Sequence, residues 1–318
     1  MDSQDLLTIL QHQSALLAML GGLVLHWVMP VPDYINPLSY CRRFAQLLSD
    51  KVNHQTDSEQ QRRLSGILSF AIIWLTLAVL LVATAQLVWQ PAFYNLFLLW
   101  LALGWKPTHH LGQSLATSLS AEDKGTARLL LSSHLNRETD GLSMIGLGKA
   151  GAETLLMGYG RNVVSVLFWF ALLGGVGAFL YSLTSTLARV WSPSRKQFDP
   201  FGRFSASVIS ILDIVPLRLF ALLICCGKGF HSGFQALMNE GEKWRAPGAG
   251  WLLSSAGSKW ELSLGGPAIY EGRKQERRKI GGQVVPAGYH LSLLNHTLQK
   301  RTLYWIAVQS VVMLIFTL

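Results

Sequence analysis

Long stretches without charged side chains restrict the fold of this chain more than any other feature. Residues 64–105 contain no Asp, Glu, Lys or Arg, and neither do residues 6–32, 162–188 and 302–318. A helix needs about 20 mostly apolar residues to cross a bilayer, and these stretches lack the two-residue alternation of a membrane β-barrel. The sequence therefore predicts an all-α, polytopic integral membrane protein with little room for a sheet.

The chain is expected to form a single membrane domain over residues 1–318, with five or six transmembrane helices. We place these spans near residues 6–30, 66–88, 91–105, 163–188, 206–227 and 302–318. The span near 163–188 contains the sequence LLGGVGAFL. Three glycines in that position permit either one bent helix or a hairpin that returns to the side from which it came.

Basic residues predict which helical loops face the cytoplasm. Lys and Arg number five in residues 33–65, six in 106–161 and eleven in 228–301, and loops rich in these residues stay on the cytoplasmic side. Residues 189–205 hold four more, although a simple alternation of six spans places that segment outside. Either the hairpin alternative is correct or residues 206–227 do not cross the membrane.

Composition indicates lipid, and not nucleic acid, as the partner of the basic residues. Only 14% of the residues are charged, whereas a soluble domain carries about a quarter. A net charge of +9 in so apolar a chain indicates loops that face anionic lipid. The sequence contains no CxxC, HExxH or P-loop pattern, so nothing in it indicates a structural metal site.

Asp213 and Arg218 interrupt the apolar run 206–227 and flank Pro216. A charge at membrane depth is costly unless it is paired or hydrated, and proline kinks a helix. One interpretation is an ion pair between the two residues at a kink near the interface. The other is a polar pocket at the membrane face that holds an anionic group.

A second group of charges lies in residues 131–169, just before a predicted span. Glu138 and Glu153 are fifteen residues apart, so they would share a face if the segment formed one continuous helix. The alternative is a solvated amphipathic helix at the membrane surface.

Residues 250–282 combine seven glycines with a run of basic side chains. The glycines exclude a regular helix throughout the segment. Backbone N–H groups beside Arg277, Arg278 and Lys279 suit a phosphate, so one interpretation is a backbone cradle for an anionic substrate. The other is a flexible basic loop against lipid head groups.

Five blocks, in this order, resemble the adenosylcobinamide-phosphate synthase family (CobD/CbiB). They are MPVPDYINPL (29–38), NRETDGLSMIGLGKAGAET (136–154), VVSVLFWFALLGGVGAFLYSLTSTL (163–187), LDIVPLRLFALL (212–223) and GWLLSSAGSKWELSLGGPAIYEGR (250–273). The resemblance implies a multi-pass protein of the bacterial inner membrane. It also implies an ATP-dependent ligase of cobalamin biosynthesis, which joins a corrinoid carboxylate (cobyric acid) to aminopropanol or its phosphate.

The same resemblance implies cofactors, partners and site residues. The cofactors are ATP and Mg²⁺, and the partners are the corrinoid, the amino alcohol or its phosphate, and membrane lipid. Carried over block by block, catalysis is assigned to Glu138, Glu153 and Asp213. Substrate binding is assigned to Arg137, Arg218, Gly265, Gly266, Pro267 and Tyr270.

Several acidic positions of the family pattern hold other residues here. Arg161 stands where the family has an Asp, and Ala188 replaces an acid after the STL sequence. Carboxylates hold magnesium and transfer protons, so these changes favour an alternative, a noncatalytic binding or signalling protein of the same fold. The AmpE-like inner-membrane group is such a relative, and it retains the block from Asp213 to Arg218.

Overall fold

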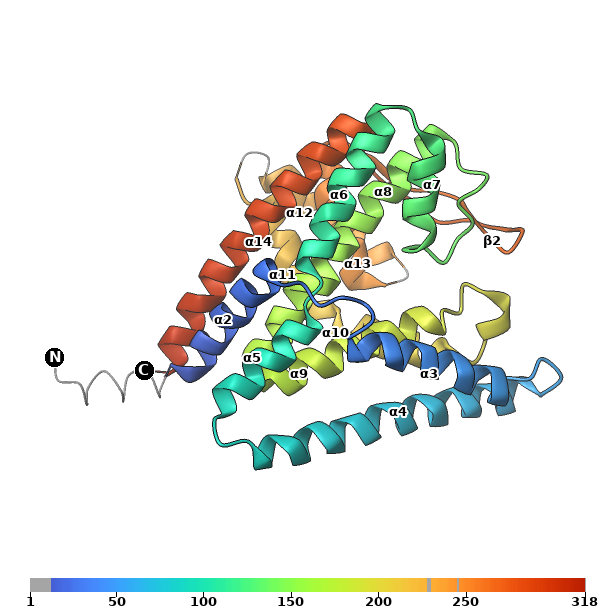
Figure 1. The fold of residues 1–318 in the computed structure, drawn as a ribbon. Helices are drawn as coiled ribbons and strands as arrows, with labels where there is room; N and C mark the ends of the chain where they lie inside the picture. The colour runs from blue at the N-terminus through green and yellow to red at the C-terminus, as the bar shows by residue number, and fades with distance from the viewer. Residues whose placement is uncertain (1–12, 228–229, 245, 318) are drawn as a thin grey trace.

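The computed structural model describes residues 13–227, 230–244 and 246–317, so the start of the predicted span 6–30 lies outside the described residues. The described chain is mainly helical, with four short strands near its C-terminal end (Figure 1). In chain order its elements are α2 (Ser14–Val28), α3 (Pro37–Val52), α4 (Glu59–Leu87), α5 (Pro91–Ala102), α6 (Trp105–Ser120), α7 (Lys124–Ser132), α8 (Met144–Tyr159), the π-helical turn η1 (Gly160–Val164), α9 (Ser165–Val190), η2 (Lys196–Phe198), α10 (Arg203–Leu212), α11 (Ile214–Cys225), α12 (Phe230–Asn239), η3 (Gly241–Lys243), α13 (Pro247–Lys259), β1 (Ser263–Gly265), β2 (Ala268–Tyr270), β3 (Arg273–Gln275), β4 (Lys279–Gly281) and α14 (Gly288–Thr317).

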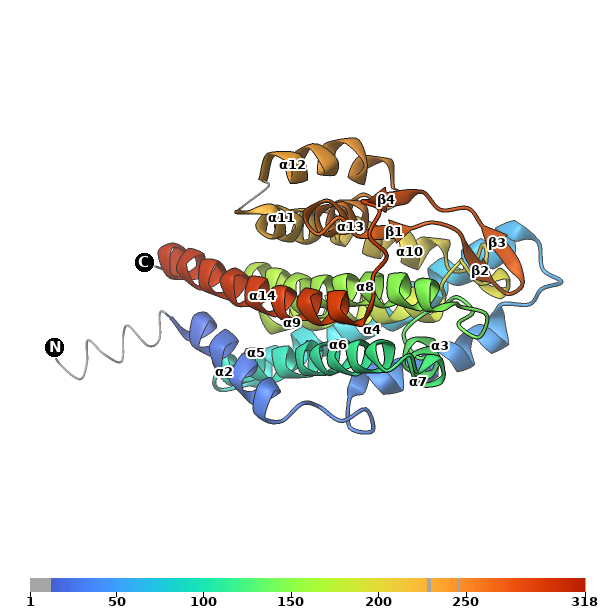
Figure 2. The same ribbon diagram turned by 90° about the horizontal axis from the view of Figure 1, so that it is seen from above.

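The helices form two inclined groups that diverge toward one end of the molecule (Figure 1). One group contains α2, α6, α8 and α14, and the other contains α3, α4 and the end of α9. A further layer of α11, α12 and α13 lies alongside α8 and α14 (Figure 2). The opening between the two groups is where the candidate site lies.

Local signals in the sequence explain where individual helices begin. α4 starts with a capping box, in which the Ser58 side chain and Gln61 satisfy each other's backbone N–H groups. α3 starts at Pro37 after an Asn36 cap, a position that suits proline because its missing N–H would have no helical partner.

The helical run Met144–Val190 covers 47 residues but reverses direction at Gly174. Gly174 has φ 65° and ψ −161°, a conformation open to glycine. Arg161 and Tyr181, twenty residues apart, both bind Asp213, whereas a straight helix of that length would separate them by about 30 Å. Residues 162–188 therefore adopt the hairpin alternative.

Helices α10 and α11 are bent by 49° where they meet. Asp213 lies at the bend, three residues before Pro216, and a proline ring prevents the preceding turn from continuing as a regular helix. The kink expected from Pro216 is thus present.

Two helical runs in the described residues are long and apolar enough to cross a membrane. They are Glu59–Leu87 and Met144–Val190, and the bent pair α10–α11 makes a third if it counts as one span. The chain is therefore a mainly helical protein with membrane-type helices, and the count of five or six spans stays a prediction.

Residues 250–282 begin as helix α13 and end as two nested pairs of short antiparallel strands. β1 pairs with β4, and β2 pairs with β3 between them; each strand has three residues, which agrees with the expectation of little room for a sheet. Gly265, the last residue of β1, and Gly266, which follows it in the turn to β2, have φ of 68° and 86°. Their left-handed conformations explain why this turn uses glycine.

Candidate functional site

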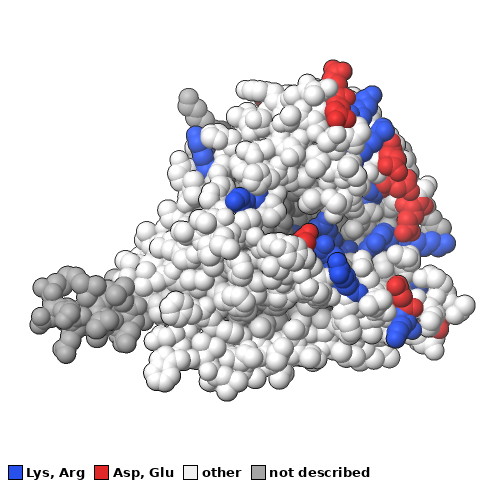
Figure 3. Space-filling view, in the orientation of Figure 1, with Lys and Arg blue, Asp and Glu red and all other residues white. Residues whose placement is uncertain are grey.

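The diverging helices enclose a cavity of about 1020 Å³. Its walls come from α8, α9 and α10, from the loop before α8, and from the segments around Trp244 and Tyr270. Charged side chains gather at this end of the molecule, whereas the opposite end is uncharged on the face shown in Figure 3. Ligand pockets commonly measure about 300–1,000 Å³, so this cavity can take a large ligand.

Cationic side chains dominate the lining of the cavity. Among the described side chains, seven Lys or Arg and two Glu line it: Arg137, Arg161, Arg189, Arg203, Lys243, Arg277 and Arg278, with Glu153 and Glu276. A cleft lined by one sign of charge concentrates the field of that charge. The cavity is therefore suited to anionic ligands.

Glu153 of α8 is the centre of the first charged cluster. Its Oε1 accepts a hydrogen bond of 2.8 Å from the backbone N–H of Gly265. Its Oε2 lies 3.2 Å from Arg277 Nη1 and 3.5 Å from Arg137 Nη2. The Arg277 guanidinium also lies over the ring of Trp244, 5.9 Å from its centre. We call Arg137, Glu153 and Arg277 the Glu153 cluster; its formal charge is one positive in excess.

Arg137 carries a buried hydrogen-bond donor that has no acceptor among the described residues. Only 9% of the residue is exposed; its Nε atom has no hydrogen-bond partner, and its Nη2 atom has only the 3.5 Å ion pair with Glu153. Burial lowers the pKa of Arg137, and the charge of Glu153 opposes this shift. A buried donor without an acceptor costs about 1–3 kcal/mol, so this Nε atom indicates a ligand that accepts hydrogen bonds.

A second cluster forms around Asp213, which is only 2% exposed. Arg161 Nε donates to its Oδ2 at 2.7 Å, and the Tyr181 hydroxyl donates to its Oδ1 at 2.6 Å. Arg189 also lines the cavity, and its Nη2 donates to the carbonyl oxygen of Ser133 at 2.8 Å. We call Arg161, Tyr181 and Asp213 the Asp213 cluster.

The structure brings only some of the predicted site residues to the cavity. Arg137, Glu153 and Tyr270 line it, and Gly265 is tied to it through Glu153. The other predicted residues are absent from the lining: Glu138, Asp213, Arg218, Gly266 and Pro267. Asp213 acts on the lining through Arg161, and the catalytic and binding roles of all nine stay predictions.

The expectation of one continuous helix through Glu138 and Glu153 is wrong. α7 ends at Ser132 and α8 begins at Met144, so Glu138 lies in the connection between them. The solvated surface helix is also wrong for this segment, because Glu153 and most of α8 are buried.

The ion pair between Asp213 and Arg218 does not form. The bend at Asp213 turns its carboxylate to Arg161, and Arg218 instead pairs with Glu242 at 2.6 Å. The Arg218 guanidinium also lies 4.7 Å from the ring centre of Trp251.

The backbone cradle predicted for residues 250–282 is already filled by the protein itself. The Gly265 and Gly272 N–H groups donate to Glu153 and Glu138, and the Gly266 N–H donates to the carbonyl oxygen of Arg278. Arginine side chains, and not these glycine N–H groups, face the cavity.

Sequence reasoning missed Arg189, Arg203 and Lys243 as cavity residues. A signal for the first two was present, because both belong to the basic segment 189–205 whose predicted side did not agree with its charge. The hairpin at Gly174 brings this segment back to the cavity end of the molecule.

The fold and the site define a class of helical, membrane-type protein with a large cation-lined cavity at one end of its helices. The chain belongs to the CobD/Cbib protein family, whose model matches residues 19–293. It is 27% identical over 278 residues to the cobalamin biosynthesis protein CobD of Stutzerimonas stutzeri (strain A1501), covering 87% of this chain and 91% of that protein. It is 28% identical over 224 residues to the protein of the same name from Chromobacterium violaceum, covering 70% and 72%. No solved structure matches the chain significantly.

Proposed function

We propose that this protein acts in cobalamin biosynthesis and joins a carboxylate of a corrinoid, cobyric acid, to aminopropanol or its phosphate. The product is cobinamide or its phosphate. Family membership supports the role in cobalamin biosynthesis. The observation that carries the amide-forming reaction is a cavity of about 1020 Å³ lined by seven cationic side chains in a member of this family.

The lining suits the substrates of this reaction. Apolar side chains such as Leu111, Met157 and Ile209 line parts of the wall and match the faces of a macrocycle. The Arg137 guanidinium, whose buried Nε has no hydrogen-bond partner among the described residues, matches a carboxylate or phosphate at the periphery of the macrocycle. Holding an amine and a carboxylate side by side lowers the barrier to their reaction through proximity.

The cationic lining matches the phosphates of ATP, and two carboxylates of the described lining, Glu153 and Glu276, could meet a magnesium ion beside them. ATP supplies the activation of the carboxylate when it is bound, and the cationic side chains match its phosphates. Magnesium is usually held by one or two carboxylates in addition to phosphates. Glu153 already contacts two arginines and a backbone N–H, so Glu276 is the other carboxylate of the described lining that could take part.

The small number of carboxylates in the described lining, two Glu against seven Lys or Arg, favours the second candidate, a noncatalytic, AmpE-like binding or signalling protein of the same fold. Its cavity would hold an anionic ligand without transforming it. Both candidates use the same cavity, so only an activity test separates them.

Complementation supplies that test. In a strain that lacks the synthase, this protein is expected to restore growth that depends on making cobalamin from cobyric acid. Arg277→Ala is expected to abolish the rescue, because it removes a cavity cation that pairs with Glu153. Arg63→Ala is the control, since Arg63 is exposed and outside the cavity. Absence of rescue by the unaltered protein, with normal amounts in the membrane, would leave only the noncatalytic candidate.

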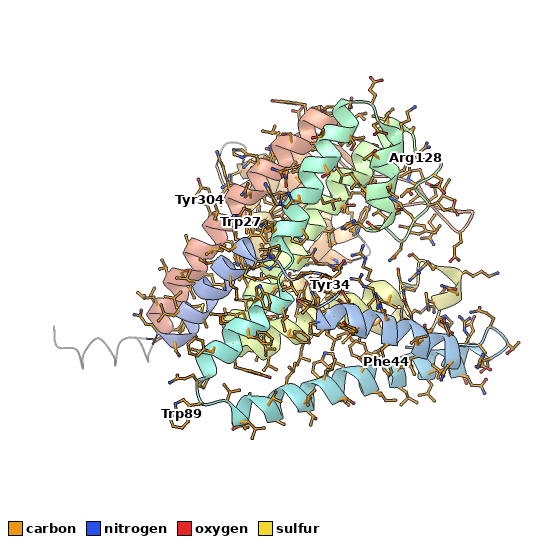
Figure 4. All side chains as sticks on the ribbon, viewed as in Figure 1. Trp27, Tyr34, Phe44, Trp89, Arg128 and Tyr304 are labelled. Carbon is orange, nitrogen blue, oxygen red and sulfur yellow. The ribbon has the colours of Figure 1, made fainter. Side chains whose placement is uncertain are left out.

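We also propose that the protein crosses the bacterial inner membrane six times, through α2, α4, α5, both limbs of the Gly174 hairpin and the end of α14. The helix α5, of 12 residues, and the hairpin limbs are shorter than a usual span, and local thinning of the bilayer accommodates them. In this arrangement α10–α11 does not cross, and every basic segment, including 189–205, faces the cytoplasm as the charge rule requires. Trp89, 92% exposed, lies at the far corner between α4 and α5 (Figure 4). Tryptophan is typical of a membrane interface.

Cysteine labelling checks this topology. In a background without Cys41, Cys225 and Cys226, Leu173→Cys should react with an impermeant maleimide from outside, because Leu173 is 62% exposed beside the hairpin bend. Lys196→Cys should react only after the membrane is permeabilised. Labelling of both positions from the same side would rule out the hairpin as a pair of spans.

A further inference from the structure

His134 lies in the cavity wall, two residues after the end of α7. It is the one histidine among the described residues of the lining. The carbonyl oxygen of its neighbour Ser133 accepts the hydrogen bond from Arg189, so the imidazole lies beside a cation of the cavity. Imidazole changes its charge near neutral pH, and the guanidinium groups that dominate this wall do not lose their protons.

Hydrogen bonds determine which nitrogen of the His134 ring carries the proton. Nδ1 lies 3.1 Å from the carbonyl oxygen of Leu130 and 2.8 Å from Ser133 Oγ. A carbonyl oxygen can only accept, so Nδ1 is the protonated nitrogen. The Ser133 hydroxyl donates to the same Leu130 carbonyl oxygen at 3.0 Å, so it accepts from Nδ1. The neutral ring therefore carries its lone pair on Nε2.

The surroundings of His134 favour the neutral ring. The side chain reaches solvent in the open cavity, yet protein encloses it closely enough for burial to lower its pKa. The charges of Arg189 and Arg42 lower the pKa further, whereas the bond to Leu130 and the charge of Asp33 oppose the shift. With a pKa below the usual 6.5 of histidine, the ring is neutral at pH 7 and its Nε2 can accept a proton.

The proposed amide synthesis needs such an acceptor. An alkyl amine such as that of aminopropanol is an ammonium ion at neutral pH, because groups of this kind titrate near pH 10, as lysine does. An ammonium nitrogen has no lone pair with which to attack a carboxyl carbon. The seven cationic side chains of the lining also repel an ammonium ion and so favour its deprotonation. The Glu153 carboxylate is already in contact with Arg137 and Arg277.

We propose that His134 is the general base of the proposed amide synthesis, and that its Nε2 removes a proton from the ammonium group of the amino alcohol. An N–H bond of the ammonium group breaks, and its electron pair stays on the nitrogen, which becomes the nucleophile. The proton forms a new N–H bond at Nε2, and the imidazolium later releases it to water. The inference deepens the proposed function and rests on it.

A pH profile of amide formation tests this role, using the purified full chain in micelles with cobyric acid, aminopropanol phosphate, ATP and Mg²⁺. His134→Asn keeps a side-chain N–H for the Leu130 carbonyl oxygen but removes the base. It should lower kcat at pH 7 by about 10²–10⁴, with the KM for cobyric acid unchanged. The loss should shrink as the pH approaches about 10, because the amine then loses its proton without help. A side chain that only supports the wall would give the same loss at every pH.

His54→Asn is the matched control, because His54 is exposed and outside the cavity, and it should keep the kcat of the unaltered protein. Melting temperatures verify that both variants are folded. If the unaltered protein forms the amide and His134→Asn keeps its kcat at pH 7, the base role is overturned and the proposed function stands. If the unaltered protein forms no amide, the proposed function fails and the base role fails with it.

Nitrogen NMR with isotopically labelled histidine provides a second measurement that does not depend on activity. The His134 signals, assigned by their loss in His134→Asn, should show a protonated Nδ1 and an unprotonated Nε2 at pH 7. A proton on Nε2 at that pH would overturn the proposal, because the nitrogen would have no lone pair to offer.

Discussion

Replacing Glu153 with alanine is expected to lower the free energy of unfolding by about 3 kcal/mol, at the lower end of the cost of breaking a buried ion pair. The substitution leaves Arg137 and Arg277 close together without a counter-charge. It also removes the acceptor of the Gly265 N–H, which holds the turn between β1 and β2. Loss of the cobyric-acid-dependent rescue should accompany the loss of stability, because the cavity wall is built on these contacts.

Denaturant unfolding in micelles, followed by circular dichroism, measures the change. Glu153→Gln retains an acceptor for the Gly265 N–H and loses only the charge, so an intermediate loss is expected. Asp50→Ala, at an exposed position of α3, is the control and should stay within about 0.5 kcal/mol. A Glu153→Ala variant as stable as this control would mean that the Glu153 cluster does not form. Partial rescue by Glu153→Gln would indicate that Glu153 positions the arginines, and complete loss would favour a role in proton transfer.

The helical, membrane-type character of the chain could be predicted because it depends on local composition. A helix that faces lipid must be apolar over its own length, so the charge-free run 64–105 indicates it directly. The kink before Pro216 could also be predicted from local sequence, because the proline ring disrupts the helical turn that precedes it.

Contacts between residues distant in sequence determine features of the structure that local sequence patterns do not predict. The glycines in LLGGVGAFL predict a break in the helix. The reversal of the chain at Gly174 is stabilised by Asn95, 80 residues earlier, whose Oδ1 accepts a hydrogen bond of 2.9 Å from the Gly175 N–H. The glycine turn at Gly265 offers N–H groups to any anion. Glu153, 112 residues earlier, supplies one from within the protein.

The partners of charged residues likewise could not be predicted from proximity in the sequence. The arginine nearest to Asp213 in sequence is Arg218, so proximity suggested that pair. The true partner is 52 residues away, and only the bend between α10 and α11 together with the Gly174 hairpin brings it there. The candidate site could therefore be located by segment, whereas its contacts required the fold.

The Asp213 cluster gives the second large expected effect. Asp213→Leu should lower the free energy of unfolding by about 2–3 kcal/mol, because it removes the buried hydrogen-bonded partner of Arg161, whose side chain is 31% exposed. Tyr181→Phe should cost about 1 kcal/mol, since it removes one hydrogen bond to the same carboxylate. The same unfolding measurement applies to each variant.

The double variant Asp213→Leu with Arg161→Met distinguishes a structural pair from a functional one. Because it removes both charges, it should be less destabilised than Asp213→Leu alone. A double variant at least as unstable as the single one would show that the two side chains do not act as a pair. If the double variant folds and still fails to rescue growth on cobyric acid, the Arg161 charge is needed in the cavity itself. Arg161 lines the cavity whereas Asp213 does not, so that result would assign the ligand contact to the arginine and its orientation to the carboxylate.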